Sequence, residues 1–265
     1  MTDGLNQLNT YLDKYTEYVK ELKARSDPNK LRVLSELRHI DIEVLNEADI
    51  FFVNNEVEML LPSYQDYYAD FGILNSANRP AFHHRWMIPI KNAEGKILNL
   101  VGYTNEEQIR YLYGTGKYYN RTDDLYGMEN LKEAYRLGYA IITEGITDTL
   151  AVRQLGFKNV FAWCGTSRSK KKQRILNRCR YGVIRIPDRD LAGKKTDAVQ
   201  VFNQTLTLYT PLDFKDSAAF LASDVVEGQV PPRENMRAAL DYCIEKIKER
   251  EHHGIIIQRD PVNMV

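Results

Sequence analysis

The chain has 265 residues, of which 43% are hydrophobic and 27% charged, so it can form one large globular domain or two small ones. Its 36 basic and 36 acidic residues give a formal net charge of zero, so any binding of nucleic acid has to come from local clusters. The three cysteines form no Cys-x-x-Cys pair, which excludes a zinc ribbon and favours a reducing, cytoplasmic setting. The charged N-terminus is no signal peptide, and no apolar run approaches the ~20 residues that span a bilayer, so we expect no membrane contact.

The N-terminal half of the chain is expected to combine helices with a β-hairpin. Apolar residues recur every three or four positions at the start, and Asp27 followed by Pro28 is a typical start of a second helix. Alternating apolar residues on both sides of a turn at Gly95 predict the hairpin. The elements expected here are helices at 5–22, 28–38 and 64–71, a strand at 51–53, and hairpin strands at 85–90 and 96–102.

The C-terminal half alternates strands with helices. We expect strands at 139–143, 159–163 and 182–186, helices at 131–137, 146–155, 170–180, 193–206 and 233–251, and a strand or extended tail at 255–265. This alternation predicts βαβ units around a parallel sheet. The fold class is therefore α/β: a domain at 137–224 with a parallel central sheet flanked by helices, a mixed α+β subdomain at 1–136, and a short helical segment at 225–265.

Carboxylates follow two of the expected parallel strands. Glu144 comes directly after one strand, Asp188 and Asp190 follow another, and Asp148 lies in the first turn of the helix after Glu144. Ligands bind beyond the carboxyl ends of parallel strands, so these side chains are expected to share one crevice, with Asp216 as a further member. Any one of these acids alone is most simply a helix cap or a solvated charge. Together they would repel each other unless cations neutralise them, and such all-oxygen ligands select Mg²⁺ or Mn²⁺.

Three segments around these acids resemble the signature blocks of the Toprim fold, which bacterial primases, topoisomerases and some nucleases share. They are Thr143-Glu-Gly-Ile-Thr-Asp148, Cys164-Gly-Thr-Ser167 and Pro187-Asp-Arg-Asp-Leu-Ala-Gly193. Three segments further upstream resemble blocks of the DnaG-type bacterial primases and occur in the same order. They are Arg85-Trp-Met-Ile-Pro-Ile90, Gly116-Lys-Tyr-Tyr-Asn120 and Leu125-Tyr-Gly-Met128. The resemblance covers about residues 80–222 and implies synthesis of short RNA primers on single-stranded DNA from ribonucleoside triphosphates.

The resemblance also implies roles for single residues. Metal binding or catalysis is implied for Glu144, Asp148, Asp188, Asp190 and Asp216. Contact with nucleic acid or nucleotide phosphate is implied for Arg85, Lys117 and Asn120. Glu144 is the expected general base, or the residue that organises it, because the attacking 3′ hydroxyl has to lose a proton. Two divalent ions on the acid cluster would hold the triphosphate and stabilise the attacking and leaving oxygens.

The sequence departs from the primase pattern at several places. Asp216-Ser-Ala218 stands where the family has Asp-Pro-Asp, so one late carboxylate is missing. The segment between Asn120 and Leu125 is short, and Arg121 is the candidate for a second basic residue expected there. No zinc-ribbon or helicase-binding segment is recognisable, so we expect a minimal core of the kind that a phage, plasmid or other mobile element encodes. Its expected partners are a replicative helicase or a separate zinc-bearing initiation protein.

A dense basic run precedes the strand that leads to Asp188. Its central members are Lys170, Lys171, Lys172 and Arg174. Such a run would neutralise the phosphates of a template beside the metals, and the alternative is a solvated helix face. Tyr118 and Tyr119 are candidates to stack on bases, with simple packing as the alternative.

Two other functions stay open. A Toprim-type nuclease would cleave phosphodiesters with the same acids, but the segment from Arg85 to Gly127 resembles primases and has no evident purpose in a small nuclease. A non-catalytic Toprim replication or recombination factor would explain Ala218, but the core acids are retained. A topoisomerase would need a longer chain with a nucleophilic tyrosine domain. A receiver-like phosphotransfer module fits the paired Asp188 and Asp190 poorly.

Overall fold

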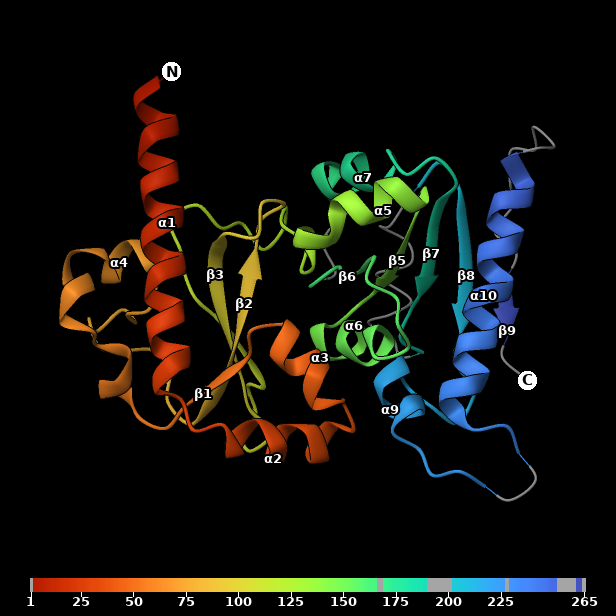
Figure 1. The fold of residues 1–265 in the computed structure, drawn as a ribbon, viewed down its shortest axis with the longest axis horizontal. Coiled ribbons are helices and arrows are strands. Elements are labelled where there is room, and N and C mark those ends of the chain that lie inside the picture. Colours follow the sequence, from red (N-terminus) through yellow and green to blue (C-terminus); the bar gives the residue numbers. More distant parts are fainter. Residues whose placement is uncertain (1, 166–168, 190–201, 227–228, 252–260, 264–265) are drawn as a thin grey trace. The chain divides into compact units, whose positions relative to one another are not determined.

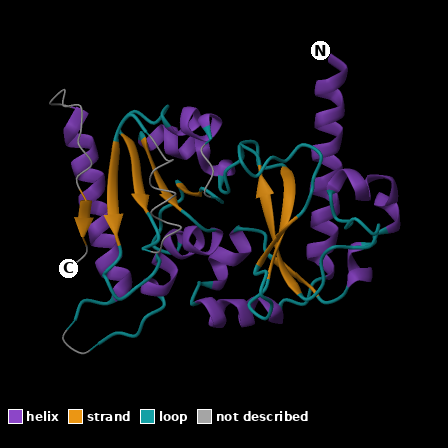
Figure 2. Cartoon of the chain, turned by 180° about the vertical axis from the view of Figure 1, so that it is seen from behind, coloured by secondary structure: helices purple, strands orange, loops and turns teal. Residues whose placement is uncertain are grey.

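The computed structural model describes residues 2–165, 169–189, 202–226, 229–251 and 261–263. The chain forms two compact units: Met1–Leu37 with Asp41–Tyr119, and Arg38–Ile40 with Asn120–Val265. Figure 1 labels the helices and strands, and Figure 2 shows that each unit is built around one sheet. The three segments expected from the sequence, 1–136, 137–224 and 225–265, stay a prediction. Within the described residues, no helix is both long and apolar enough to cross a bilayer.

The first unit contains a four-stranded antiparallel sheet in the order β1-β2-β3-β4. Its elements are α1 (Thr2–Arg25), α2 (Asn29–Arg38), α3 (Ile42–Glu47), β1 (Phe51–Val53), 3-10 helices at Glu56–Met59 and Pro62–Tyr67, α4 (Tyr68–Phe71), β2 (Arg85–Lys91), β3 (Ile97–Tyr103) and β4 (Tyr111–Tyr113). The predicted helices at the start, the short strand and the hairpin are confirmed. The predicted helix at 64–71 is α-helical only in α4, and β4 was not expected.

The core of the first unit is rich in aromatic side chains. Tyr15 and Tyr18 of α1 are fully buried, and the ring of Tyr15 stacks on Phe71 with centroids 4.2 Å apart. Their hydroxyls are satisfied, because Tyr15 donates to the carbonyl of Phe71 at 3.0 Å and Tyr18 to that of Met59 at 2.8 Å. Burying each such ring stabilises the fold by about 1.5–3 kcal/mol. The apolar stripe of the first helix is therefore core, as predicted.

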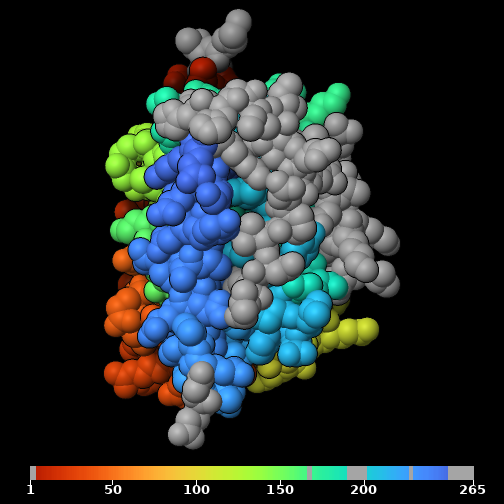
Figure 3. Space-filling view, turned by 90° about the vertical axis from the view of Figure 1, so that its right-hand side faces the viewer, coloured from red at the N-terminus to blue at the C-terminus, as the bar shows by residue number. Residues whose placement is uncertain are grey.

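The second unit contains a five-stranded parallel sheet in the order β6-β5-β7-β8-β9. Its elements are a 3-10 helix at Met128–Asn130, α5 (Leu131–Leu137), β5 (Tyr139–Thr143), α6 (Ile146–Arg153), β6 (Val160–Ala162), α7 (Lys170–Leu176), β7 (Gly182–Ile186), β8 (Thr205–Tyr209), α9 (Ser217–Leu221), α10 (Pro232–Glu251) and β9 (Pro261–Asn263). The parallel sheet with flanking helices is confirmed. On one face, α6, α9 and α10 share a core with β5, β7 and β8. Figure 3 shows the outer side of α10 (blue) at the surface.

Two element predictions in this unit were wrong at their ends. The end of the helix expected at 193–206 overlaps β8, which is a strand. In β8, the buried Leu206 and Leu208 alternate with threonines. That alternation is a strand pattern, and the preceding part, 193–201, lies outside the described residues. The basic helix ends at Leu176 and not at Arg180. Gly138 ends α5 as predicted, because its φ of 80° lies in the left-handed region that favours glycine.

Candidate active site

The carboxyl ends of β5 and β7 bring two of the predicted acids into contact. The strands pair in parallel with Thr143 opposite Ile186, so Glu144 and Asp188 follow aligned strand ends. The backbone N–H of Asp188 donates to Oε1 of Glu144 at 3.2 Å. The chain leaves β5 for β6 on one side of the sheet and then for β7 on the other. Such a switch point is where open parallel sheets form their ligand crevices.

Asp148 and Asp216 join this site from α6 and from the start of α9. Asp148 is only 6% exposed, and its Oδ1 accepts hydrogen bonds from the Ser217 hydroxyl at 3.2 Å and the Ala218 N–H at 3.0 Å. Asp216 caps α9, with Oδ1 accepting from the N–H of Ala219 at 2.8 Å. The start of α9 therefore fixes the orientation of both carboxylates.

The acids of this site oppose one another's ionisation. Burial and then the nearby Asp216 raise the pKa of Asp148 to about 6. Burial, followed by the charges of Asp148, Glu144 and Asp216, raises the pKa of Asp188 to about 8. The ammonium of Lys215, 4.0 Å from Asp188 Oδ2, counteracts this effect only in part. Full ionisation of these acids would therefore concentrate negative charge that a bound cation would relieve.

The donor set fits a hard divalent cation. All four described acids offer carboxylate oxygens, the ligands that Mg²⁺ and Mn²⁺ take in proteins. Among the residues that the structure describes, no group of three or more His, Cys, Asp or Glu side chains is positioned to hold a metal ion. The fifth predicted ligand, Asp190, lies outside the described residues. Metal binding at the cluster thus stays a prediction, which the mutual repulsion of the acids supports.

Two residues that anchor the acids were not predicted as site residues. Ser217 holds Asp148, and the pattern Asp216-Ser217 before an apolar run is an N-cap signal that the sequence already contains. Arg189 ties the acidic segment after β7 to the segment before α9: its N–H donates to the carbonyl of Lys215 at 2.7 Å, and its Nε to that of Thr210 at 2.5 Å. No local pattern marks Arg189, because both of its partners are distant in sequence.

The basic run divides into exposed and buried members. Lys170, Lys171 and Arg174 are exposed on α7, and Lys171 forms an ion pair with Asp124 at 2.9 Å. Lys172 is 1% exposed, and its ammonium donates to the carbonyl of Trp163 at 2.6 Å and to that of Arg121 at 2.9 Å. Burial lowers the pKa of Lys172 to about 8. This burial argues against the predicted phosphate contact, because the ammonium is already committed to two carbonyls.

Arg85 is likewise an interior residue. It is 3% exposed, and its guanidinium donates to the carbonyl of Ile109 at 3.1 Å and pairs with the carboxylate of Glu107. The side chain holds the segment between β3 and β4 in place. Contact of Arg85 with a phosphate is therefore unsupported, since the interior position and these partners keep it from the surface.

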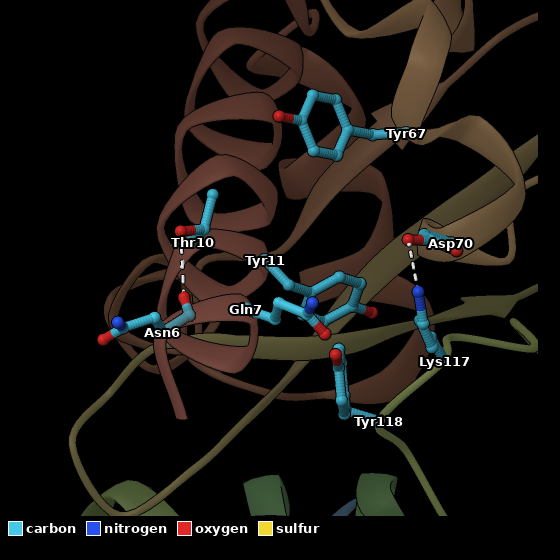
Figure 4. A pocket seen from close by; sticks show the side chains of 8 residues that line it. All are labelled: Asn6, Gln7, Thr10, Tyr11, Tyr67, Asp70, Lys117 and Tyr118. Atoms are coloured by element: carbon cyan, nitrogen blue, oxygen red, sulfur yellow. Dashed lines mark hydrogen bonds and ion pairs between the residues drawn. The ribbon is translucent and has the colours of Figure 1, made fainter. Parts of the chain in front are cut away.

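The remaining predicted phosphate contacts are exposed. In the first unit, Lys117 pairs with Asp70 at 3.0 Å and lines a pocket of about 310 Å³ together with Tyr11, Tyr67 and Tyr118 (Figure 4). In the second unit, Oδ1 of Asn120 accepts from the N–H of Thr122 at 2.9 Å. Nε of Arg121 donates to the carbonyl of Cys164 at 3.3 Å. Each of these three residues, Lys117, Asn120 and Arg121, has a hydrogen-bond partner within its own unit and is nevertheless exposed to solvent.

Comparison with known proteins supports the predicted fold. Residues 141–207 match the Toprim-like family. The DNA primase of Aquifex aeolicus is 27% identical over 158 residues, 58% of this chain and 30% of that protein. The DNA primase of Thermotoga maritima is 28% identical over 233 residues, 81% of this chain and 41% of that protein. The chain thus spans less than half the length of these relatives.

A solved structure of the DnaG primase catalytic domain bound to single-stranded DNA resembles the chain with a TM-score of 0.65 at 18% identity. The match covers 92% of this chain and 80% of that one. The predicted Toprim fold and the resemblance to DnaG-type primases are confirmed.

Proposed function

We propose that the chain acts as the catalytic core of a DNA primase, which joins ribonucleoside triphosphates into short RNA primers on a single-stranded DNA template. The observation that carries the proposal is the contact between Glu144 and Asp188 at the aligned ends of β5 and β7. It occurs in a chain with the fold of DnaG catalytic cores. Relatives named DNA primase and a neighbour solved with single-stranded DNA support the choice of reaction and template.

In this mechanism the chain's own residues orient the acids. Glu144, Asp148, Asp188 and Asp216, with Asp190, would hold Mg²⁺ or Mn²⁺, which supplies positive charge for binding and polarising the triphosphate. Ser217 and the N–H of Ala218 keep Asp148 in one orientation, and the N–H of Asp188 does the same for Glu144.

Glu144 is our candidate for accepting the proton of the attacking 3′ hydroxyl, or for orienting the group that does. The hydroxyl oxygen then bonds to the α-phosphorus of the next triphosphate, and the bond to the departing pyrophosphate breaks. The product is one nucleotide longer.

Template contacts are proposed at exposed cations of each unit. On α7 these are Lys170, Lys171 and Arg174, and in the first unit Lys117 beside Tyr118. Their charges would neutralise backbone phosphates, and the ring would stack on a base. We propose Asn120 and Arg121 as further contacts to nucleotide phosphate. A replicative helicase or a separate zinc-bearing initiation protein is the proposed partner, in the cytoplasm of the bacterial or host cell.

Primer synthesis from labelled ribonucleotides on single-stranded DNA, with Mg²⁺ and with Mn²⁺, tests this function. We expect short RNA products from the wild type and none from Asp188→Ala. Asp213→Ala is the matched control, because Asp213 is an exposed acid of the same unit and should leave synthesis unchanged. Metal-dependent shortening of the DNA without RNA products would favour the Toprim-type nuclease. Neither activity, with all variants folded, would favour a non-catalytic factor.

A further inference from the structure

A second pocket, walled by lysines, lies within the first unit. Its volume is about 290 Å³, close to the lower limit for small-ligand sites. The side chains that form it come from α1, from Asp49 before β1, and from the β2–β3 hairpin. The lysines are Lys20, Lys23, Lys91 and Lys96. Thr16, Val19 and Ile97 line it as well, and Glu94 is its second acid. The pocket shares no residue with the candidate active site.

The charges of this pocket are unbalanced. Four lysines and two carboxylates line the pocket, and Asp13, which pairs with Lys96 at 2.6 Å from outside the lining, lowers the local net charge to +1. Asp49 forms ion pairs with two of the lysines. Its Oδ1 accepts a hydrogen bond from Lys23 Nζ and its Oδ2 accepts one from Lys91 Nζ, both at 2.6 Å. Burial opposes ionisation of Asp49, but the hydrogen bonds from both lysines outweigh it and hold its pKa below the ordinary value. One carboxylate between two ammonium groups leaves a positive charge unpaired.

Asp49 holds two of the lysines, Lys23 and Lys91, in place before any ligand arrives. Lys91 has a side chain only 11% exposed, and its ammonium is fixed by Asp49 at 2.6 Å. Asp49 takes a left-handed φ of 58°, which Asp and Asn tolerate better than most residues. The hairpin is tied to α1 by the Ile97 N–H, which donates to the Thr16 hydroxyl at 3.0 Å. Preorganised charge of this kind binds without a large ordering cost.

We infer that this pocket binds the phosphate groups of a nucleotide, of a polyphosphate or of a nucleic-acid backbone. Ammonium groups on separate elements surround one anion, with charge-assisted hydrogen bonds that are stronger than neutral ones. Lys20 is exposed at the rim, while Lys23 and Lys91 are shared between the anion and Asp49. The pocket does not depend on the primase proposal, because none of its residues takes part in the proposed chemistry.

Two probes, inorganic tripolyphosphate and a fluorescent oligothymidylate, test the pocket in low salt with EDTA, which keeps metal-mediated binding at the acids out of the measurement. The double variant Lys20→Ala/Lys23→Ala should bind at least one probe about tenfold more weakly than the wild type. Lys14→Ala is the matched control, because Lys14 lies on the same helix, pairs with Glu17 and does not line the pocket. We expect the control to change affinity by less than about twofold. Weaker binding of tripolyphosphate alone identifies free phosphates as the ligand, and weaker binding of the oligonucleotide identifies the nucleic-acid backbone.

A second variant separates binding from a structural role. Asp49→Asn keeps a residue that tolerates the left-handed backbone but removes the internal anion, so tripolyphosphate should bind about tenfold more tightly. If the double variant binds both probes as Lys14→Ala does, the inference is overturned. It is overturned as well if Asp49→Asn binds tripolyphosphate no more tightly than the wild type. Should the double variant fail to fold, Lys20→Ala alone, which truncates an exposed side chain, gives the same comparison.

Discussion

The free energy of unfolding should depend on pH through Lys172. Its ammonium is buried against the carbonyls of Trp163 and Arg121, and burial lowers its pKa from 10.5 to about 8. Between these two values the unfolded chain carries a proton that the folded protein has released. The folded state is therefore favoured increasingly as pH rises through this window. The stabilisation gained between pH 7 and pH 9.5 is about 2 kcal/mol.

Lys172→Met removes this dependence while keeping much of the buried stem. At pH 7 the variant loses two hydrogen bonds, which costs about 1–3 kcal/mol per unsatisfied carbonyl, and regains the cost of burying the charge. The two effects nearly offset each other at pH 7. Because only the wild type gains stability above pH 8, it should exceed the variant by about 2 kcal/mol more at pH 9.5 than at pH 7.

Urea denaturation of both proteins from pH 7 to pH 9.5 measures this difference. The buried tyrosines, such as Tyr15 and Tyr18 with raised pKa values, titrate alike in both proteins and cancel. Lys170→Met, an exposed neighbour on the same helix, is the control and should show no pH-dependent difference. If the difference in the free energy of unfolding between the wild type and Lys172→Met stayed constant from pH 7 to pH 9.5, the inference that the Lys172 ammonium is buried would be refuted. The inference that Lys172 is buried would also be refuted if Lys172→Met weakened the salt dependence of DNA binding as much as Lys170→Met does.

Further predictions concern the acids, the basic helix and a turn. Asp188→Asn should abolish primer synthesis yet raise the melting temperature of the metal-free protein at pH 7, because the wild-type carboxyl, whose pKa is raised to about 8, has to take up a proton on folding and the amide does not. A lower melting temperature would contradict this. Lys170→Ala with Lys171→Ala should reduce the slope of log K against log salt for single-stranded DNA by about 1.4, since each lost phosphate contact contributes about 0.7. An unchanged slope would mean that this helix face is solvated and does not contact the DNA. Gly138→Ala should destabilise by about 1–3 kcal/mol in urea denaturation, because φ is 80° and the new Cβ would lie 2.6 Å from the Tyr181 ring. A loss below about 0.5 kcal/mol would show that this turn relaxes freely.

The local pattern of the sequence was sufficient for most elements and for the position of the acids. The hairpin at 85–102, the end of α5 at Gly138 and the strands β5 and β7 follow from alternation, turn residues and apolar runs, which depend on near neighbours. Once those strands were expected to be parallel, Glu144 and Asp188 had to follow ends on the same edge of a sheet. Their direct contact also requires β7 to lie beside β5, which the sheet order β6-β5-β7 decided.

Burial of charged side chains was decided only by the tertiary structure. Lys172 is one of three consecutive lysines, and nothing local separates it from exposed Lys170 and Lys171. It is buried because α7 turns this position toward the carbonyls of Trp163, nine residues away, and of Arg121, 51 residues away. Arg85, held by the segment that follows β3, is a similar case.

The lysine pocket also depends on the tertiary structure. Asp49 meets Lys23 and Lys91 across gaps of 26 and 42 residues, and only the packing of α1 on the hairpin brings them together. A sequence determines where charges lie along an element. Which of them face water, and which face each other, depends on the elements that pack against them.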